Sequence, residues 1–529
     1  MEEPAAGAAT VRLAELVATL SLATDLGLGQ PLEHTVRQTK LALRLADEIG
    51  VVDDDRVATY YTGLLDSVYC HADAHEQAIW FGDDIGLKAD SYEADMESLR
   101  GLLLVLRRLG AGDVGLARAR RIATFPFSGW REVNGFLHTH SALQSRFAAE
   151  IGLPQAVRDA LLQSYERWDG KGVPNGIAGE AISLAARIVN VADLAEVYNR
   201  TGGVEAARQV TQERSRGQLD PALVDLFCER APKLLEGLDR EATWGEVIES
   251  EPGLGRMVSG AELDRVLEAM ADLVDMKSPH MAGHSRGVAN LAAEAARVSG
   301  MSSAEVATLR RAGFVHDLGR LGVSNAIWDK RGSLSDTELE RVRLHPYLSD
   351  RMLAGVPALG AVRALAARHH ERLDGSGYPR GLRAAALSRG DRLLAAADAY
   401  HAMTEPRPHR EALERDPAGA ELRAEVKAGR FDGAAANAVL EAAGHRARAR
   451  REWPGGLTAR EVEVLGLLAR GKSNKQIATA LTVTPKTVSS HVEHIYSKID
   501  VSSRATATLF ATQHGLVGSF ETSTDASAV

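Results

Sequence analysis

The 529-residue sequence is poor in cysteine and in aromatic residues, and it has no long apolar run. Its two cysteines, Cys70 and Cys228, are spaced neither as a disulfide framework nor as a thiolate metal site. No stretch of about 18 uninterrupted apolar residues occurs, and the N-terminus lacks the pattern of a secretion signal. We therefore expect a cytoplasmic protein that does not interact with a membrane.

Alternating apolar and polar runs, which would indicate strands, are also scarce. Most segments instead repeat apolar residues at the helical spacing, as in residues 32–49 and 261–274. The sequence therefore predicts an all-α fold, and its length predicts about three domains. The net charge of −9 excludes a general polyanion binder, so any contact with nucleic acid must involve a local basic region.

Two parts of the chain resemble each other. Near the start the offset is 250 and further on it is 205, which implies an insertion of about 45 residues between positions 67 and 140. We predict two related helical domains, at 1–250 and 251–445. The matching pairs are His34 with His284, GLLDS (63–67) with GFVHD (313–317), His140 with His345, GKGVP (170–174) with GSGYP (375–379), and Asp193 with Asp398.

Histidine and aspartate side chains accumulate in the second copy, and they are suited to iron, manganese or zinc. A lone histidine is more often a helix-end residue than a ligand, but five of the 17 histidines belong to this set. In an adjacent His-Asp pair the aspartate can bridge two cations, which about 3.5–4 Å apart polarise a phosphate and activate water. The candidate ligands are His284, His316, Asp317, His345, His369, His370 and Asp398.

The motifs around these residues occur in the order and spacing of the HD-GYP subgroup of HD-domain phosphohydrolases, over about 275–435. The resemblance implies a helical fold with a two- or three-metal centre, typically of iron or manganese. It also implies hydrolysis of cyclic di-GMP to linear pGpG or GMP. The motifs are HMAGHSRGVA (280–289), AGFVHDLGRLGV (312–323), LHPYLSDRML (344–353), RHHERLDGSGYP (368–379) and AAADAYHAMT (395–404).

The same resemblance implies roles for individual residues. The seven candidates would be metal ligands, with Asp317 bridging. Arg320 stands where the family has a lysine and would stabilise charge on the phosphate, as a planar fork rather than a point charge. His280 replaces a glutamate that ligates a third metal, which disfavours that metal, and His409 replaces a tyrosine. Substrate contacts would come from Arg320, Gly377, Tyr378, Pro379 and Arg407.

The first copy lacks much of this set. Asp66 and Ser67 stand where the second copy has His316 and Asp317, and Ser164 and Tyr165 replace the two adjacent histidines. We therefore expect a degenerate HD domain used for packing, dimerisation or ligand sensing. In the insertion, His71, His75 and Glu76 lie beside Cys70; we interpret them as part of a capped, solvated helix rather than as a metal site.

The C-terminal region predicts a separate unit. Residues 446–455 form a basic linker, 456–520 a compact helical domain, and 521–529 a flexible tail. Between 456 and 518 there are seven basic and four acidic residues, a local charge of +3. Thr458 and Glu461 form a capping box. A second helix that begins at Pro485 follows a short helix and turn, which is the pattern of a helix-turn-helix.

This stretch also resembles the LuxR-type DNA-binding domain along its whole length. The resemblance implies a four-helix module that binds double-stranded DNA, usually as a homodimer through a last helix at about 502–514. By the same resemblance, Lys486, Thr487, Ser490 and His491 would face base edges or phosphates. Lys472, Asn474 and Lys475 would lie near the DNA backbone.

Together these features predict a transcriptional regulator that combines a metal-dependent phosphodiesterase with a DNA-binding domain. The nucleotide substrate is expected to be cyclic di-GMP. Two alternatives stay open. The protein could be a transcription factor that senses a nucleotide without hydrolysing it, or an HD phosphohydrolase that acts on another nucleotide.

Overall fold

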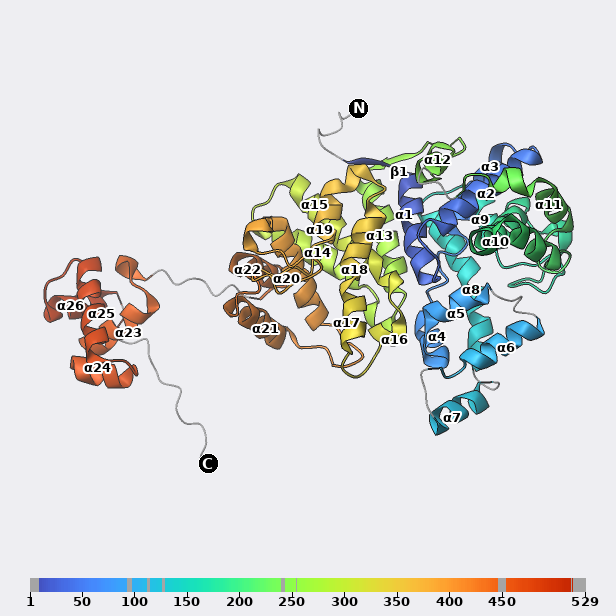
Figure 1. Cartoon of the computed structure of the whole chain (residues 1–529). Helices are drawn as coiled ribbons and strands as arrows, with labels where there is room; N and C mark the ends of the chain where they lie inside the picture. Colours follow the sequence, from blue (N-terminus) through green and yellow to red (C-terminus); the bar gives the residue numbers. More distant parts are fainter. Residues whose placement is uncertain are drawn as a thin grey trace. The chain divides into compact units, whose positions relative to one another are not determined.

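The computed structural model describes residues 9–92, 98–111, 115–125, 129–238, 243–253, 255–445, 453–514 and 516. The chain forms two compact units, Met1–His445 and Arg446–Val529. Apart from one pair of three-residue strands, the regular elements of the described residues are helical, which confirms the all-α class (Figure 1). Most of the expected linker (446–452) and the expected tail lie outside the described residues. None of the described helices combines the length and apolarity that crossing a bilayer requires.

The first copy begins with a short strand and three helices, followed by the insertion and a second helical group. Its elements are β1 (Thr10–Arg12), α1 (Leu13–Gly27), α2 (His34–Glu48), α3 (Asp53–Leu65), α4 (Ala74–Phe81), α5 (Asp84–Ser91), α6 (Leu99–Arg108), α7 (Leu116–Thr124), α8 (Gly129–Glu150), α9 (Gln155–Leu161), η1 (Gly179–Ala181), α10 (Leu184–Glu213), α11 (Pro221–Leu235) and α12 (Thr243–Glu249). The insertion predicted between residues 67 and 140 therefore contains α4 to α7.

The second copy repeats this arrangement without the insertion. Its elements are β2 (Met257–Ser259), α13 (Gly260–Asp275), η2 (Pro279–Met281), α14 (His284–Val298), α15 (Ser303–Val315), η3 (Leu318–Gly322), α16 (Asn325–Trp328), α17 (Asp336–Arg343), α18 (His345–Leu353), η4 (Pro357–Leu359), α19 (Gly360–Ala366), η5 (Ala384–Ala386), α20 (Arg389–Met403), α21 (Arg415–Lys427) and α22 (Gly433–Ala442).

The same local hydrogen bonds recur in both copies at the offset of 250. The buried carboxylate of Asp25 accepts hydrogen bonds from the backbone and hydroxyl of Thr35, and Asp275 accepts the same pair from Ser285. In each copy the aspartate closes one helix and holds the start of the helix that carries the first candidate histidine. The internal repeat read from the sequence therefore has a counterpart in these local contacts.

The two copies share one hydrophobic core. Strand β1 of the first copy pairs antiparallel with β2 of the second, with Val11 opposite Val258. Helix α1 packs against η3 and α18 of the second copy, and its buried Leu16 and Leu20 join Leu267 in one apolar cluster. The first copy consequently forms a wall of the domain that carries the candidate metal ligands.

The insertion also packs against the second copy, through contact between α4 and α16. His71 is buried, and its Nε2 lies 2.7 Å from the carbonyl oxygen of Leu273. The interpretation of this segment as a solvated helix is therefore wrong for His71. The sequence could not reveal the burial, because the covering surface comes from a part of the chain 202 residues away.

The C-terminal unit consists of η6 (Pro454–Gly456), α23 (Ala459–Ala469), α24 (Asn474–Ala480), α25 (Pro485–Lys498) and α26 (Arg504–Gln513) around its own core. The capping box of Thr458 and Glu461 is confirmed, and a second one joins Ser473 to Gln476. Val488 and Ile495 anchor α25 in the core. A helix, a tight turn at Leu481–Thr484 and a second helix give the predicted helix-turn-helix.

Candidate metal centre and C-terminal surface

The seven candidate ligands come from five segments of the second copy and converge on one point. His284 begins α14 directly after Gly283, whose φ of 79° lies in the left-handed region that glycine adopts easily. His345 begins α18, and Asp398 lies within α20. His316 and Asp317 directly follow α15, and His369 and His370 follow α19. The side chains of all seven are almost completely buried, except that of His370, which is 21 % exposed.

Asp317 lies between two groups of imidazoles. Its Oδ2 is 3.4 Å from Nε2 of His316 and 3.8 Å from Nε2 of His284. Its Oδ1 is 3.4 Å from Nε2 of His345 and 3.7 Å from Nε2 of His369. Each oxygen of one carboxylate therefore faces a separate nitrogen pair, which is the geometry that a ligand shared by two cations requires.

The orientation of three of these rings leaves Nε2 free for a cation. Nδ1 of His316, His345 and His369 lies 2.6–2.8 Å from a backbone carbonyl oxygen three residues earlier, so Nδ1 carries the proton. Nε2 of His316 is buried without a hydrogen-bond partner, and Nε2 of His345 lies 3.1 Å from Nε2 of His369. Because two unprotonated nitrogens repel each other, this donor set suits a divalent cation between them.

Burial and the neighbouring charges shift the pKa values of several of these groups. Burial lowers the pKa of His284, but Asp398 and Glu405 raise it to about 9. Burial lowers the pKa of His345 to about 4 and that of His369 to about 3, so both imidazoles are neutral at pH 7. Burial alone would raise the pKa of Asp317, but His316, Arg320 and His345 together lower it well below its usual range. Neutral imidazoles and ionised carboxylates are the protonation states in which these groups ligate metals.

A cavity of about 350 Å³ opens over this centre. Arg320 lines it, with Nη1 at 3.6 Å from Oδ2 of Asp317 and its guanidinium 3.6 Å from the ring centroid of Trp328. Tyr378 also lines it, and its ring lies against that of His370. Of the other predicted substrate contacts, Arg407 lines the cavity, whereas Gly377 and Pro379 shape the turn beside it.

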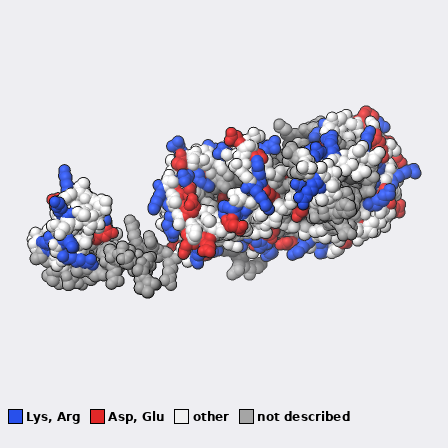
Figure 2. All heavy atoms as spheres, turned by 90° about the horizontal axis from the view of Figure 1, so that it is seen from below, with Lys and Arg blue, Asp and Glu red and all other residues white. Residues whose placement is uncertain are grey.

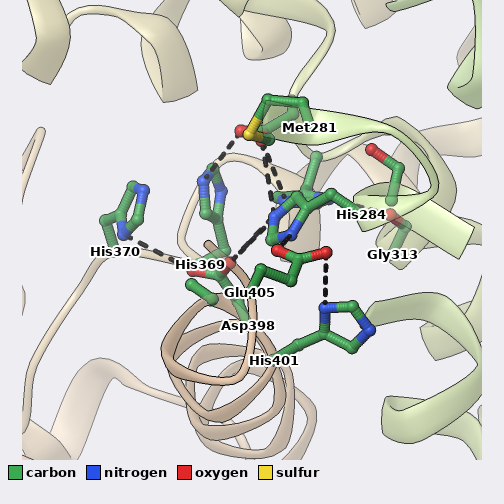
Figure 3. A network of polar contacts seen from close by, with 12 residues as sticks. Met281, His284, Gly313, His369, His370, Asp398, His401 and Glu405 are labelled. Carbon is green, nitrogen blue, oxygen red and sulfur yellow. Dashed lines mark hydrogen bonds and ion pairs between the residues drawn. The ribbon is translucent and has the colours of Figure 1, made fainter. Parts of the chain in front are cut away.

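The sequence reading did not single out Glu405. Its carboxylate lies 2.8 Å from Nδ1 of His284 and 3.2 Å from Nδ1 of His401, four residues earlier in the sequence (Figure 3). Glu405 thereby holds His284 with Nε2 directed at Asp398, 3.4 Å away. The spacing of His401 and Glu405 was a possible signal, but only the fold brings the pair to His284.

His284, His401 and Glu405 also form a group with the composition of a further cation site. The guanidinium of Arg407 lies 2.8 Å from Glu405 and 3.3 Å from Nδ1 of His284, so a positive charge is already present there. His280, which stands where the family has a glutamate ligand, lines the cavity. These contacts favour Glu405 as a residue that orients His284.

In the first copy, protein side chains fill the corresponding position. His34 lies 2.5 Å from Glu196 and 3.1 Å from Asp193, and Arg37 donates to Glu196 at 2.6 Å. Burial lowers, but Glu196 and Asp193 raise, the pKa of His34 to about 10, and the same pairing lowers that of Glu196 to about 2. An internal ion pair therefore occupies the space that the second copy leaves to its candidate ligands.

At two further positions of the first copy, Asp66 and Tyr165 stand in place of candidate ligands and form hydrogen bonds within the protein. Asp66 accepts a hydrogen bond from Gln38 at 3.1 Å, and its backbone carbonyl accepts one from the hydroxyl of Tyr165. Burial raises the pKa of Asp66 well above its usual range. His140, the third shared residue, lies 3.7 Å from Asp73.

In the C-terminal unit the predicted contact residues lie on the two helices of the helix-turn-helix. Lys486, Thr487 and Ser490 are exposed at the start of α25, and His491 is half-buried. Lys472 and Lys475 are exposed near the start of α24, while Asn474 donates a hydrogen bond to Ser489 of α25 at 3.2 Å. Basic side chains are prominent on the face of this unit that Figure 2 shows.

Comparison with known proteins agrees with this arrangement. Family models match residues 132–223 and 268–435 ("HD domain") and residues 456–511 ("Bacterial regulatory proteins, luxR family"). The chain is 30% identical to the 3'3'-cGAMP-specific phosphodiesterase 3 of Vibrio cholerae, over 77% of this chain and 90% of that protein. A cyclic di-GMP phosphodiesterase of Pseudomonas aeruginosa is 34% identical over 35% of this chain and 46% of its own length.

A solved structure is also similar. The crystal structure of a cyclic GMP-AMP-specific phosphodiesterase of Vibrio cholerae matches 82% of this chain and 98% of its own length, at 26% identity and a TM-score of 0.56. Fold, site and relatives together define a metal-dependent phosphohydrolase. The chain belongs to the HD-domain family, in its HD-GYP group of phosphodiesterases, and its C-terminal unit is a LuxR-type domain, as the motifs predicted.

Proposed function

We propose that the protein hydrolyses a 3'3'-cyclic dinucleotide at a two-metal centre bridged by Asp317. The observation that carries the proposal is the position of this carboxylate, whose two oxygens face different imidazole pairs at 3.4–3.8 Å. One cation would be held by His284, His316 and Asp398, the other by His345, His369 and His370. Nitrogen and carboxylate ligands without thiolates suit iron or manganese.

Two bound cations would supply Lewis-acid polarisation of the scissile phosphate and an activated water. The protein's own residues would do the rest. Arg320, beside Asp317, would donate to the phosphate oxygens and offset the charge that develops on them. Tyr378 would border the nucleotide, and Arg407, which also lines the cavity, would supply a second positive charge.

We choose the substrates to test from the names of the relatives and from the positive charge of the cavity. The relative that this chain matches over 90% of its length is named for 3'3'-cGAMP, whereas cyclic di-GMP phosphodiesterases match over shorter segments. Both molecules carry two phosphodiesters, which suits a cavity lined by four arginines, Arg320, Arg372, Arg407 and Arg410. We therefore propose 3'3'-cGAMP as the first substrate to test and cyclic di-GMP, the substrate expected from the motifs, as the second, each giving a linear dinucleotide.

The test is metal analysis of the purified protein followed by product identification with each dinucleotide. Asp317→Ala should lose bound metal, and its hydrolysis rate should fall by at least about 1000-fold, because the shared ligand is removed. Asp416→Ala, at a side chain that is 97 % exposed, serves as the matched control and should behave as the native protein does. Hydrolysis that persists in Asp317→Ala would refute the proposal.

We further propose that the C-terminal unit binds double-stranded DNA as a homodimer through α26, with the start of α25 in the major groove. The exposed Lys486, Thr487 and Ser490 at that end of α25 support this proposal. Such a protein would work in the cytoplasm, where the chromosome lies. Lys486→Ala should weaken binding to all sequences and reduce the salt dependence by about one counterion, whereas an unchanged salt slope would contradict a phosphate contact.

A further inference from the structure

The segment inserted into the first copy contacts residues that line the catalytic cavity. We call residues 277–280 and 324–329 of the second copy the pocket rim; Ser278, Trp328 and Asp329 of this rim line the cavity. Two side chains of the insertion, His75 and Asp84, are bonded to the rim. Neither has a role in the proposed chemistry, and neither belongs to the part of the sequence that matches the HD domain model.

Of these two residues, Asp84 makes the more extensive contact with the pocket rim. Its side chain is completely buried, and Oδ1 accepts hydrogen bonds from the hydroxyl of Ser324 at 2.6 Å and the backbone N–H of Asn325 at 2.8 Å. Its Oδ2 lies 3.3 Å from Nζ of Lys277, which is also buried. A single carboxylate of the first copy thus joins both halves of the rim.

His75 extends this connection towards the cavity. Its Nδ1 lies 2.7 Å from Oδ2 of Asp329, whose Oδ1 accepts a hydrogen bond from Ser278 at 2.7 Å. Asn325 donates to the same Oδ2 at 3.0 Å and to the carbonyl oxygen of Lys277 at 2.6 Å. The rim is therefore a continuous hydrogen-bonded frame with two attachments in the insertion.

Trp328 links this frame to the catalytic arginine. It ends α16, the short helix whose first residue, Asn325, is held by Asp84. Its indole ring lies 3.6 Å from the guanidinium of Arg320, and its Nε1 donates to the carbonyl oxygen of Arg320 at 3.3 Å. A planar cation stacked on an aromatic face keeps its orientation better than a free side chain does.

We propose that Asp84 and His75 are positioning residues for the hydrolase, which act through the pocket rim and Trp328 to hold Arg320 over the metal centre. The inference rests on the proposed function of Arg320. It gives the first copy, whose own site is filled, a part in completing the catalytic pocket of the second. The residues that line the cavity belong to the second copy, and two side chains of the first copy would hold its rim in place.

The test is a double-mutant cycle of Asp84→Asn and Arg320→Ala in the full chain, with kcat and KM measured for 3'3'-cGAMP and cyclic di-GMP. Asp84→Asn should lower kcat about tenfold with little change in KM or metal content, because misplacing a catalytic group has this order of effect. In the Arg320→Ala background it should cause no further loss. An equal loss in both backgrounds would overturn the proposal.

The matched control is Asp90→Asn in the same helix, since Asp90 pairs with Arg108 inside the insertion rather than with the rim. If Asp84→Asn melts below the assay temperature, His75→Ala takes its place, because His75 is partly exposed and its loss disturbs the core less. It should give the same non-additivity with Arg320→Ala, at about two- to threefold loss.

A readout without substrate separates this inference from the proposed function. Hydrogen exchange of residues 320–329 should become faster in Asp84→Asn than in Asp90→Asn, whether or not either dinucleotide is cleaved. If the native protein cleaves neither dinucleotide, the proposed function fails, and unchanged exchange would then also reject the connection between Asp84 and Arg320.

Discussion

At the scale of single residues, the site depends on where protons and lone pairs point. Three backbone carbonyl oxygens accept hydrogen bonds from Nδ1–H of His316, His345 and His369, which directs Nε2 of each ring to the centre. The carboxylate of Glu405 accepts the corresponding hydrogen bond from Nδ1–H of His284. Groups outside the proposed ligand set therefore orient the rings within it.

The residue Glu405 gives a direct prediction. Glu405→Gln keeps the shape but removes the negative charge that accepts the Nδ1 proton of His284, so we expect metal affinity about 10–100-fold lower. Competition with a chelator, followed by measurement of retained metal, provides the test. Glu411→Gln, at an exposed glutamate of the same segment, is the control and should retain the native affinity. Equal affinities in both variants would exclude the orienting role.

The ion pair of the first copy predicts a pH dependence of stability. Glu196 has a pKa of about 2 in the folded protein, below its ordinary value of 4.5, so its contribution is present above pH 4.5 and is lost as the pH falls towards 2. His34, with a pKa of about 10, contributes below pH 6.5 and loses this contribution as the pH rises towards 10. The pair stabilises the fold most between about pH 4.5 and 6.5.

Glu196→Gln should therefore lower the free energy of unfolding by about 3 kcal/mol or more at pH 6, since it leaves buried charges unpaired. The difference in Tm from the native protein should shrink as the pH is lowered to 3. Glu205→Gln, at a glutamate whose side chain is 83 % exposed, should show a small and constant difference. A difference for Glu196→Gln that does not change with pH would contradict the assignment.

At the scale of elements, the turn after His370 is held by its own hydrogen bonds. The two carboxylate oxygens of Glu371 accept the backbone N–H groups of Arg380 and Leu382 at 2.8 and 2.7 Å. A Cβ on Gly377 would collide with the backbone of Glu371 and Arg372, so this close approach requires glycine. The turn places Tyr378 against His370 as a consequence.

Gly377→Ala should accordingly destabilise the protein by about 1–3 kcal/mol, because the backbone cannot move away from the added methyl group. Gly360→Ala is a matched control, since nothing lies within 4 Å of a Cβ at this helical position. It should be neutral or stabilise the fold by about 0.4–1 kcal/mol. Thermal unfolding measures both, and a Tm for Gly377→Ala equal to that of Gly360→Ala would count against the close packing.

At the scale of elements, much of the fold and of the candidate site could be predicted from the sequence. Helix periodicity, the capping box at Thr458 and the repeat at two offsets are local or additive signals, and each has its counterpart in the structure. The seven candidate ligands were found because they stand in compact motifs. Asp84, Trp328 and the buried His71 were not, because their roles arise from packing between segments that the sequence does not connect.

At the scale of the whole molecule, the division into two compact units predicts that each unit folds independently of the other. Ending the chain at His445 should leave the Tm of the larger unit and its hydrolysis rate within error, because the C-terminal unit has its own core. Ending it at Glu371 instead would remove α20 with Asp398 and should abolish the cooperative transition. A large loss of activity on ending at His445 would show that the C-terminal unit supports the hydrolase.

The core shared by the two copies has a consequence for how such a hydrolase can be reused. Helix α1 covers leucines of the second copy, and β1 pairs with β2. The second copy, which carries the candidate ligands, would therefore expose apolar surface and aggregate if it were expressed alone. The first copy therefore serves as the cover of the second, although it lacks much of the ligand set.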